Sequence, residues 1–123
     1  MKEGLLLFAH GARDAAWARP FEIVTERLRA ARPDTPLAMA YLEFMSPNMD
    51  EAAAQLAAAG CTRVHVMPLF LGTGGHVRRD VPLLLDRLRA QHGDAVEWRL
   101  HAPLGDQDAV LQAITLACLA PLE

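Results

Sequence analysis

The stretch LLLFAHGARD, residues 5 to 14, gives the clearest indication of the fold. An apolar run that is long enough for a buried strand ends at a His-Gly pair beginning with His10, and Arg13 follows. A similar order of residue types returns in VMPLFLGTGGHVRRDVP, residues 66 to 82, where a glycine-rich loop, His76 and two arginines follow an apolar run. Both histidines are therefore predicted to lie just after a strand.

Four strand-like runs alternate with four helical patterns along the chain. The predicted strands are residues 4 to 9, 36 to 43, 63 to 70 and 96 to 102. The alternation predicts an α/β fold with right-handed crossovers, in which a four-stranded parallel sheet in the flavodoxin-like order 2-1-3-4 carries helices on both faces. The length of 123 residues predicts a single domain over residues 1 to 123.

Apolar spacing predicts which side of each helix is buried. The first helix, about 15 to 32, is expected to bury Phe21, Val24, Leu28 and Ala31. The second is expected to begin at Ser46, with Pro47 in its first turn, and to bury Ala53, Leu56 and Ala57. The third is expected to bury Val81, Leu84, Leu85 and Leu88, and a fourth is expected over about 106 to 119.

Charge and hydropathy exclude several classes of function. A formal net charge of −3 argues against a nucleic-acid partner, because binding to the phosphate backbone needs a basic face. No apolar run approaches the roughly 20 residues of a membrane span, and the amino end lacks a signal-peptide pattern, so we expect no membrane partner and a cytoplasmic location. Cys61 and Cys118 are isolated in the sequence and are read as reduced, packed thiols.

Ionisable residues follow each predicted strand. In an open parallel sheet ligands bind beyond the carboxyl ends of the strands, so these residues are expected to share one edge. They are His10 with Arg13, Glu43, His76 and, more weakly, His101. Each also has an ordinary structural interpretation, in which the side chain contacts nearby backbone or solvent. His65 is expected to have a role in the core or on the face of its strand rather than in catalysis, and His92 at the end of its helix.

The loop after the third strand is a candidate ligand-binding segment. Its glycines would let a large ligand approach the backbone, and N–H groups at the start of the next helix favour carboxylate or phosphate. The alternative is a plain long turn, because the loop matches neither the Walker pattern nor GxGxxG. The predicted substrate-binding residues are Arg13, Gly72, Thr73, Gly74, Gly75, Arg78 and Arg79.

Two histidines, one carboxylate and several arginines suit metal insertion into a tetrapyrrole. Neutral imidazole binds divalent transition metals and also accepts protons near neutral pH. Insertion requires both functions, because the macrocycle loses two pyrrole protons as the metal loses its waters. Catalytic roles are accordingly predicted for His10, His76 and Glu43, and a transient metal site for His10 and His76.

The motifs LLLFAHGARD, AYLEFMSPNMDEA, VMPLFLGTGGHVRRDVP and HAPLGD, taken in this order, resemble the short CbiX-type class II chelatases, the sirohydrochlorin cobaltochelatases and ferrochelatases. The resemblance implies a chelatase-like fold and a homodimer whose two copies mimic the halves of larger chelatases. It also implies that His10 and His76 bind the incoming metal and that Glu43 assists. One departure is Ala12, which replaces the serine of the usual HGSR motif.

The predicted partner is therefore a tetrapyrrole, and the divalent metal is a substrate rather than a permanently bound cofactor. Cobalt is the expected metal, with Fe²⁺ and Ni²⁺ as alternatives. Two other functions stay open at this point. One is a protein that binds the metal or the tetrapyrrole without catalysis. The other is a histidine-dependent phosphotransferase, which Ala9 disfavours because such enzymes usually carry an arginine immediately before the histidine.

Overall fold

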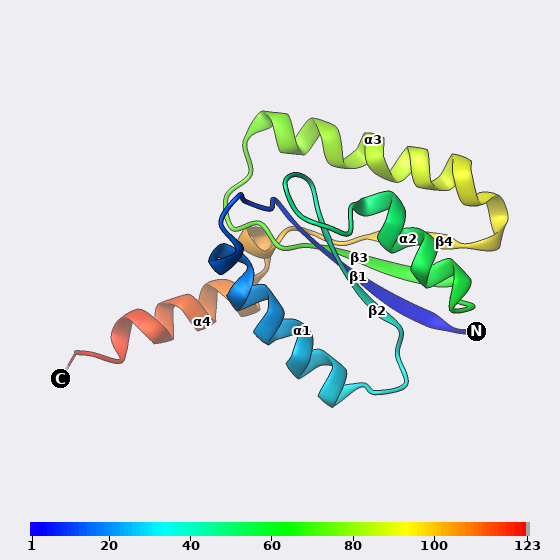
Figure 1. Ribbon diagram of the computed structural model, residues 1–123. Helices are drawn as coiled ribbons and strands as arrows, with labels where there is room; N and C mark the ends of the chain where they lie inside the picture. Colours follow the sequence, from blue (N-terminus) through cyan, green and yellow to red (C-terminus); the bar gives the residue numbers. More distant parts are fainter. Residues whose placement is uncertain (123) are drawn as a thin grey trace.

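The computed structural model describes residues 1 to 122, except for the side chain of His76. Four parallel strands form one sheet: β1 (Glu3–Ala9), β2 (Leu37–Tyr41), β3 (Arg63–Pro68) and β4 (Glu97–Leu100). Their order is β2-β1-β3-β4, which confirms the predicted topology. Figure 1 shows β1 and β3 in the middle of this sheet.

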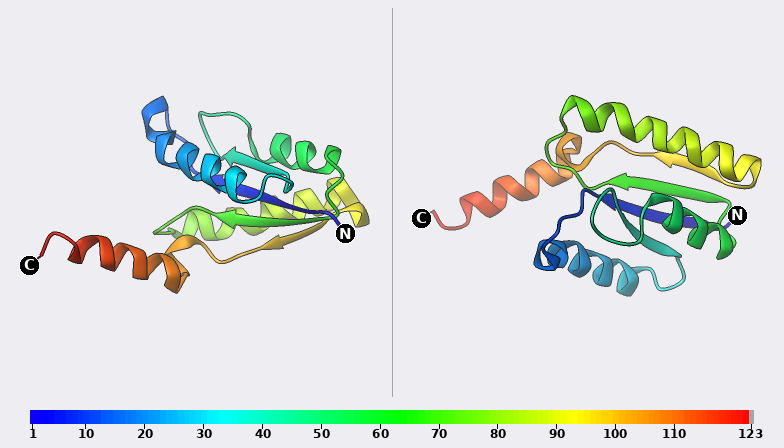
Figure 2. Two further views of the ribbon diagram at one scale, coloured as in Figure 1. Left: turned by 90° about the horizontal axis from the view of Figure 1, so that it is seen from below. Right: turned by 45° about the horizontal axis from the view of Figure 1, so that its top comes forward.

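Helices lie on both faces of the sheet, as predicted. They are α1 (Arg19–Ala31), which follows a 3-10 turn η1 (Ala15–Ala18), α2 (Met49–Ala58), α3 (Gly75–His92) and α4 (Asp108–Leu119). Two views in Figure 2 show α1 on one face and α2 with α3 on the other. No described helix is long and apolar enough to cross a membrane.

The main core lies between the sheet and the pair α2 and α3. Side chains that alternate along the strands point to this face, among them Leu6, Phe8, Val64 and Val66, each fully buried. The predicted stripe of α3 is confirmed, since Val81, Leu85 and Leu88 are buried and Leu84 packs against the core. A smaller apolar cluster lies under α1 and η1. Burial on both faces explains why β1 reads as a nearly continuous apolar run.

Two local predictions are wrong. The helix α2 begins at Met49 rather than at Ser46, because Asn48 and Glu51 form a reciprocal capping box that satisfies the first backbone N–H groups. In α1 the buried side chain is Thr25, while Val24 and Ala31 are exposed. The Thr25 hydroxyl donates a hydrogen bond of 2.8 Å to the Phe21 carbonyl, so its burial leaves no polar group unsatisfied.

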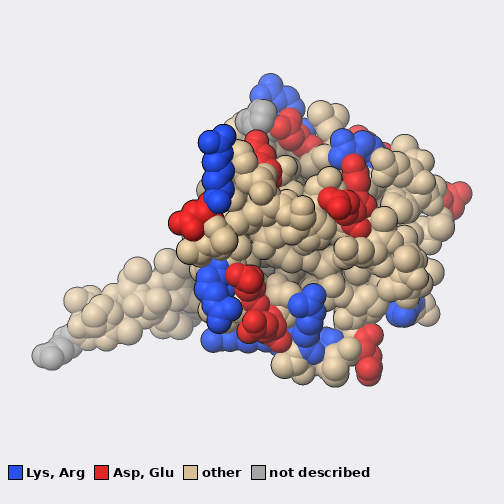
Figure 3. All heavy atoms as spheres, in the orientation of Figure 1, with Lys and Arg blue, Asp and Glu red and all other residues tan. Residues whose placement is uncertain are grey.

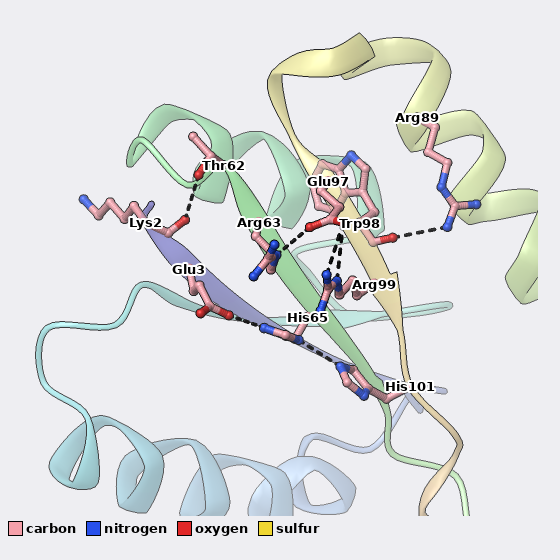
Figure 4. Close-up of polar contacts among 10 residues, drawn as sticks. All are labelled: Lys2, Glu3, Thr62, Arg63, His65, Arg89, Glu97, Trp98, Arg99 and His101. Carbon is pink, nitrogen blue, oxygen red and sulfur yellow. Dashed lines mark hydrogen bonds and ion pairs between the residues drawn. The ribbon is translucent and has the colours of Figure 1, made fainter.

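The sheet face over β3 and β4, on the side of α1, carries a polar network (Figure 4). Residues of three strands take part. The His65 ring donates a hydrogen bond to the Glu3 carboxylate through Nε2, and its Nδ1 lies 2.9 Å from His101 Nε2. Arg63 and Arg99 both contact the Glu97 carboxylate. Of the two roles predicted for His65, in the core or on the strand face, the structure shows the second, and His101 is already held by a neighbour.

The helix α4 leaves the body of the molecule instead of covering this polar face. Figures 1 and 2 show it projecting past the carboxyl ends of the strands, connected through the short 3-10 turn η3 (Leu104–Asp106). Its range agrees with the predicted fourth helix, but no residue of α4 is buried. The face of β3 and β4 therefore stays open beside α1.

We expect the network to make stability depend on pH. The hydrogen bond from His65, with the positive charges of Arg63 and Arg99 nearby, holds the pKa of the Glu3 carboxyl below its ordinary value of 4.5. A lowered folded-state pKa stabilises the fold above the unfolded pKa, and this contribution disappears as the pH falls through the folded pKa. Glu3→Gln should therefore lower the melting temperature at pH 7, and the difference from the wild type should shrink below about pH 4.5. Thermal unfolding followed by circular dichroism measures both; a difference independent of pH would contradict the charge-based account.

Candidate functional site

The loops after β1 and β2 are joined by backbone hydrogen bonds. Leu42 N–H donates to the Ala9 carbonyl at 3.0 Å, and Glu43 N–H donates to the His10 carbonyl at 2.9 Å. The parallel pairing of the two strands thus continues for one residue into the loops. It brings two of the predicted catalytic residues, His10 and Glu43, next to each other along the edge, and both side chains are exposed.

Gly11 makes this close approach possible. Its φ of +88° lies in the left-handed region, and a Cβ atom built on it would lie 1.9 Å from the Glu43 carbonyl oxygen. Any side chain at this position would push the two loops apart. The glycine of the His-Gly pair therefore sets the separation between the loops that carry His10 and Glu43.

Arg13 is held over the second loop. Its guanidinium carbon lies 4.9 Å from the centre of the Phe44 ring, which is a cation–π contact. Phe44 has a φ of 66° and an exposed ring, a costly backbone conformation for an aromatic residue. The sequence analysis missed Phe44, because neither its φ nor its contact with Arg13 leaves a signal in residue types or spacing.

His10 lies against Phe70 and lines an apolar hollow. The two ring centres are 4.7 Å apart. The hollow has a volume of about 390 Å³ and lies between the body of the domain and the first turns of α4. Its lining residues are His10, Trp17, Phe21, Leu69, Phe70, Leu71, Gly72, Leu104, Val110 and Ile114. An imidazole on an apolar wall can bind a metal ion that has shed part of its water shell.

The loop after β3 lies beside a second hollow of about 270 Å³. Arg78 Nε donates a hydrogen bond of 3.2 Å to the Thr73 hydroxyl, and both residues line this hollow, as does His101. Arg79 is exposed nearby in α3 and is not among the residues that line either hollow. Of the predicted substrate-binding side chains, the described structure therefore brings only Thr73 and Arg78 into direct contact.

The glycines of this loop are not required by the fold. A Cβ atom at Gly72, Gly74 or Gly75 would meet nothing within 4 Å, and none of the three has a positive φ. Gly74 is the N-cap of α3 and has no side chain to satisfy the first N–H groups of the helix. The first backbone N–H groups of α3 thus have no side-chain cap, an arrangement that favours an anionic group at a helix N-terminus. The predicted metal ligand His76 lies in this first turn, but its side chain is outside the described part of the chain.

The loop after β4 packs against the loop after β3. A Cβ atom on Gly105 would lie 1.6 Å from the Leu71 carbonyl oxygen, and Gly105 N–H donates to the Phe70 carbonyl at 3.0 Å. Gly105 belongs to the motif HAPLGD, but the sequence alone does not predict the role of this glycine, because that role depends on the contact with Leu71. Gly105 therefore positions the loop whose residues Phe70 and Leu71 line the hollow beside His10.

The loops after β1, β2 and β3 thus meet at one edge of the sheet, as predicted. Among the described side chains, no three histidine, cysteine, aspartate or glutamate residues come together as a metal cage. What the described residues offer at this edge is the exposed imidazoles of His10 and His101, one carboxylate near His10, arginines and helix N–H groups without a side-chain cap. This set can meet a metal ion and an acidic ligand without enclosing either.

Comparison with known proteins identifies the family. The CbiX family model matches residues 4 to 117. The chain belongs to the CbiX family. Its relatives include proteins named sirohydrochlorin cobaltochelatase from Saccharolobus islandicus, 32% identical over 87% of this chain and 86% of theirs, and Saccharolobus solfataricus, 31% identical over the same shares. The family resemblance predicted from the sequence is therefore confirmed.

Solved structures of the family share the fold. A putative cobalamin biosynthesis CbiX protein from Marinobacter aquaeolei has a TM-score of 0.84 and 34% identity, with 98% of this chain and 97% of that chain covered. The sirohydrochlorin chelatase SirB from Bacillus subtilis, solved in complex with cobalt, has a TM-score of 0.76 and 23% identity, with 96% of this chain but only 50% of that chain covered. This CbiX chain therefore corresponds in length to the Marinobacter protein and to about half of SirB.

The surroundings of Gly11 and Gly72 predict that alanine substitutions at these two positions have different effects on stability. Gly11→Ala should destabilise the protein by about 2 kcal/mol or more, because the new Cβ would overlap a backbone carbonyl and the φ is unfavourable. Gly72→Ala, which has open space and an ordinary φ, should change the free energy of unfolding by less than about 1 kcal/mol. Chemical denaturation of both variants tests this, and equal effects would contradict the role assigned to Gly11.

Proposed function

We propose that this CbiX protein inserts a divalent metal ion into sirohydrochlorin. Membership of the family makes the chain a chelatase-type enzyme, and the observation that carries the proposal is the match to the cobaltochelatases over nearly the whole chain. The edge of the sheet supports it independently, since an exposed imidazole, a carboxylate and anion-favouring N–H groups lie on adjoining loops there.

His10 is proposed as a transient ligand of the incoming metal, together with His76. The imidazole of His10 lies against the Phe70 ring, and both line an apolar hollow where no described cage of ligands would retain the ion. A site with few ligands releases the metal as readily as it accepts it, and transfer to the four nitrogens of the macrocycle requires such release.

The proton balance assigns a second role to the same residues. A divalent ion replaces the two pyrrole N–H protons of the macrocycle, so two protons leave for each metal inserted. Once the metal has passed to the macrocycle, the freed imidazole nitrogen of His10 can accept one of them. Glu43 is adjacent through the backbone contact to His10 and is exposed, so its carboxylate can take up the other or pass it to solvent.

Peripheral carboxylates of the tetrapyrrole are proposed to bind at the arginines and at the start of α3. Arg13 is fixed over the Phe44 ring, and Arg78 is oriented by Thr73. The segment Gly72 to Gly75 leaves the backbone accessible, so N–H groups of the first turn can bind an anion directly. Arg79 adds positive charge beside them.

Cobalt is the proposed metal substrate, with Fe²⁺ and Ni²⁺ as alternatives, and no permanently bound cofactor is proposed. We also propose that the enzyme is a homodimer in the cytoplasm. Hollows of about 270 and 390 Å³ lie at the lower end of the size range of ligand pockets and are open, whereas a tetrapyrrole is a wide ligand. A second copy would enclose such a ligand more completely than one sheet edge can.

An anaerobic insertion assay with sirohydrochlorin and Co²⁺, followed by the visible spectrum, tests the proposal. We expect multiple turnovers by the wild type and a loss of about 100-fold or more in kcat for His10→Ala and for His76→Ala, as for removal of a group that transfers protons. The matched control is His92→Ala, since His92 lies at the opposite end of α3 against the Trp98 ring and should leave kcat unchanged.

Insertion no faster than in the absence of protein, with Fe²⁺ and Ni²⁺ also tried, would refute the enzymatic proposal. Binding of metal or tetrapyrrole without turnover would instead identify a carrier. Full activity of His10→Ala would remove that residue from the mechanism.

The anchoring role of Arg78 predicts a different kinetic signature. Arg78→Gln should raise KM for sirohydrochlorin several-fold with a smaller change in kcat, because it removes binding that is similar in the ground state and the transition state. Arg27→Gln, on the exposed side of α1, serves as the control for a general loss of positive charge. Equal effects of the two variants on KM would show that Arg78 contributes only to the overall electrostatic field of the protein and does not bind sirohydrochlorin directly.

A further inference from the structure

We infer that α4 is an exchanged arm, which in a symmetric pair of copies occupies the apolar hollow beside His10 of the other copy. This inference rests on the homodimer in the proposed function and adds which segment forms it. The partner's helix would then form part of the wall of each metal site, so that neither site is complete in a single copy.

The first observation is that α4 has no charged side. After Asp108, no Lys, Arg, Asp or Glu occurs from residue 109 to 122. Figure 3 shows this segment as an uncharged projection. Large apolar side chains are exposed all along it: Leu111, Ile114, Leu116, Leu119 and Leu122 have exposed fractions of 41 to 71%. A helix with large apolar side chains and no charge after its first residue is normally buried, and an exposed apolar surface of this extent marks an interface.

The second observation explains why α4 does not bury itself on its own domain. The free part of the sheet, over β3 and β4, carries the carboxylates of Glu3 and Glu97, the guanidinium groups of Arg63 and Arg99, and two histidines (Figure 4). An uncharged helix placed there would desolvate these groups and supply no hydrogen bonds to them, which costs free energy. The apolar surface of α4 must therefore be covered by another molecule.

The third observation is a complementary host surface on the same chain. The hollow beside His10 is lined by aromatic and aliphatic side chains of the body, including Trp17 and Phe21, and on one side by Val110 and Ile114 of α4 itself. It is open and apolar, so it suits an uncharged helix. Because guest and host surfaces lie side by side on one chain, a two-fold axis lets each copy donate its α4 and receive the other, as a closed dimer requires.

The lengths of the related proteins favour a second copy over an unrelated partner. This chain spans 97% of the Marinobacter CbiX protein but only half of SirB, although the matched half has the same fold. This chain therefore corresponds to one half of a SirB-sized molecule, and α4 leaves apolar surface uncovered on it. A second copy of the same chain would supply the other half without any other protein.

Sedimentation equilibrium of the full chain tests the role of α4. The wild type should be a dimer at micromolar concentration, and Leu116→Glu should weaken association by at least about 30-fold, as for loss of a central interface side chain. The matched control is Leu83→Glu on α3, because Leu83 and Leu116 are similarly exposed, at 61% and 58%. It should leave the dimer intact. A monomeric wild type, or a Leu116→Glu variant that dimerises normally, would overturn the inference.

Energy transfer between mixed subunits tests where α4 lies. One subunit carries Trp98→Phe and Cys118→Ser, which leaves Trp17 as its only tryptophan. The other carries Trp17→Phe and Trp98→Phe, with an acceptor dye on the exposed Cys118 near the tip of α4. Cys61 should escape labelling, because it is buried and burial raises the pKa of its thiol. If α4 of the labelled subunit lies in the hollow of the other subunit, the dye comes close to Trp17, which lines that hollow.

Strong transfer in the mixed dimer, abolished by Leu116→Glu, would support the exchange. A stable dimer without transfer would place the interface elsewhere and overturn the inference.

The proposed metal insertion and the exchange of α4 can be refuted separately. An exchanged dimer that inserts no metal would refute the proposed metal insertion and keep the inference. Insertion by a monomer, at a rate per subunit independent of concentration, would refute the inference and the proposed homodimer while keeping the proposed metal insertion.

Discussion

The hydrogen bonding of β1 on both of its edges is the constraint on which the rest of the structure depends. Because β1 pairs with β2 on one side and β3 on the other, the loops that follow all three strands must emerge together. The pairing continues past the strand ends, where Leu42 and Leu69 donate to carbonyls of Ala9 and Phe8. His10 therefore leaves the sheet between two loops whose distance from it is set by backbone geometry, before any side chain contributes.

Most of the fold was predictable from the sequence, because its signals are local and mutually consistent. Apolar runs alternating with helical spacing determine the elements, and the handedness of crossovers then leaves few topologies. The location of the candidate site was also predictable, because residues that follow parallel strands must share one edge of the sheet. The histidines, the carboxylate and the arginines indicated metal insertion into a tetrapyrrole, and the family resemblance specified sirohydrochlorin.

The details that escaped prediction depend on contacts between distant segments or on side-chain hydrogen bonds. Thr25 is buried because its hydroxyl has a partner within its own helix, which a hydrophobicity pattern does not record. The ring of Phe44 supports Arg13 only because of an unusual backbone angle, and Gly105 matters only because the Leu71 carbonyl lies against it. The direction of α4 was hidden as well, since apolar spacing shows that a helix must be covered and not which molecule covers it.

The strand β4 also determines how the sheet can meet other chains. It is an edge strand of only four residues, and Glu97 and Arg99 lie along it with an ion pair to each other. A short, charged edge is a poor template for the addition of a further strand, so it guards against continuous stacking of sheets into aggregates. Such protection matters in a protein that also exposes the apolar side chains of α4. The charges on β4 thus disfavour any contact between copies through this edge of the sheet.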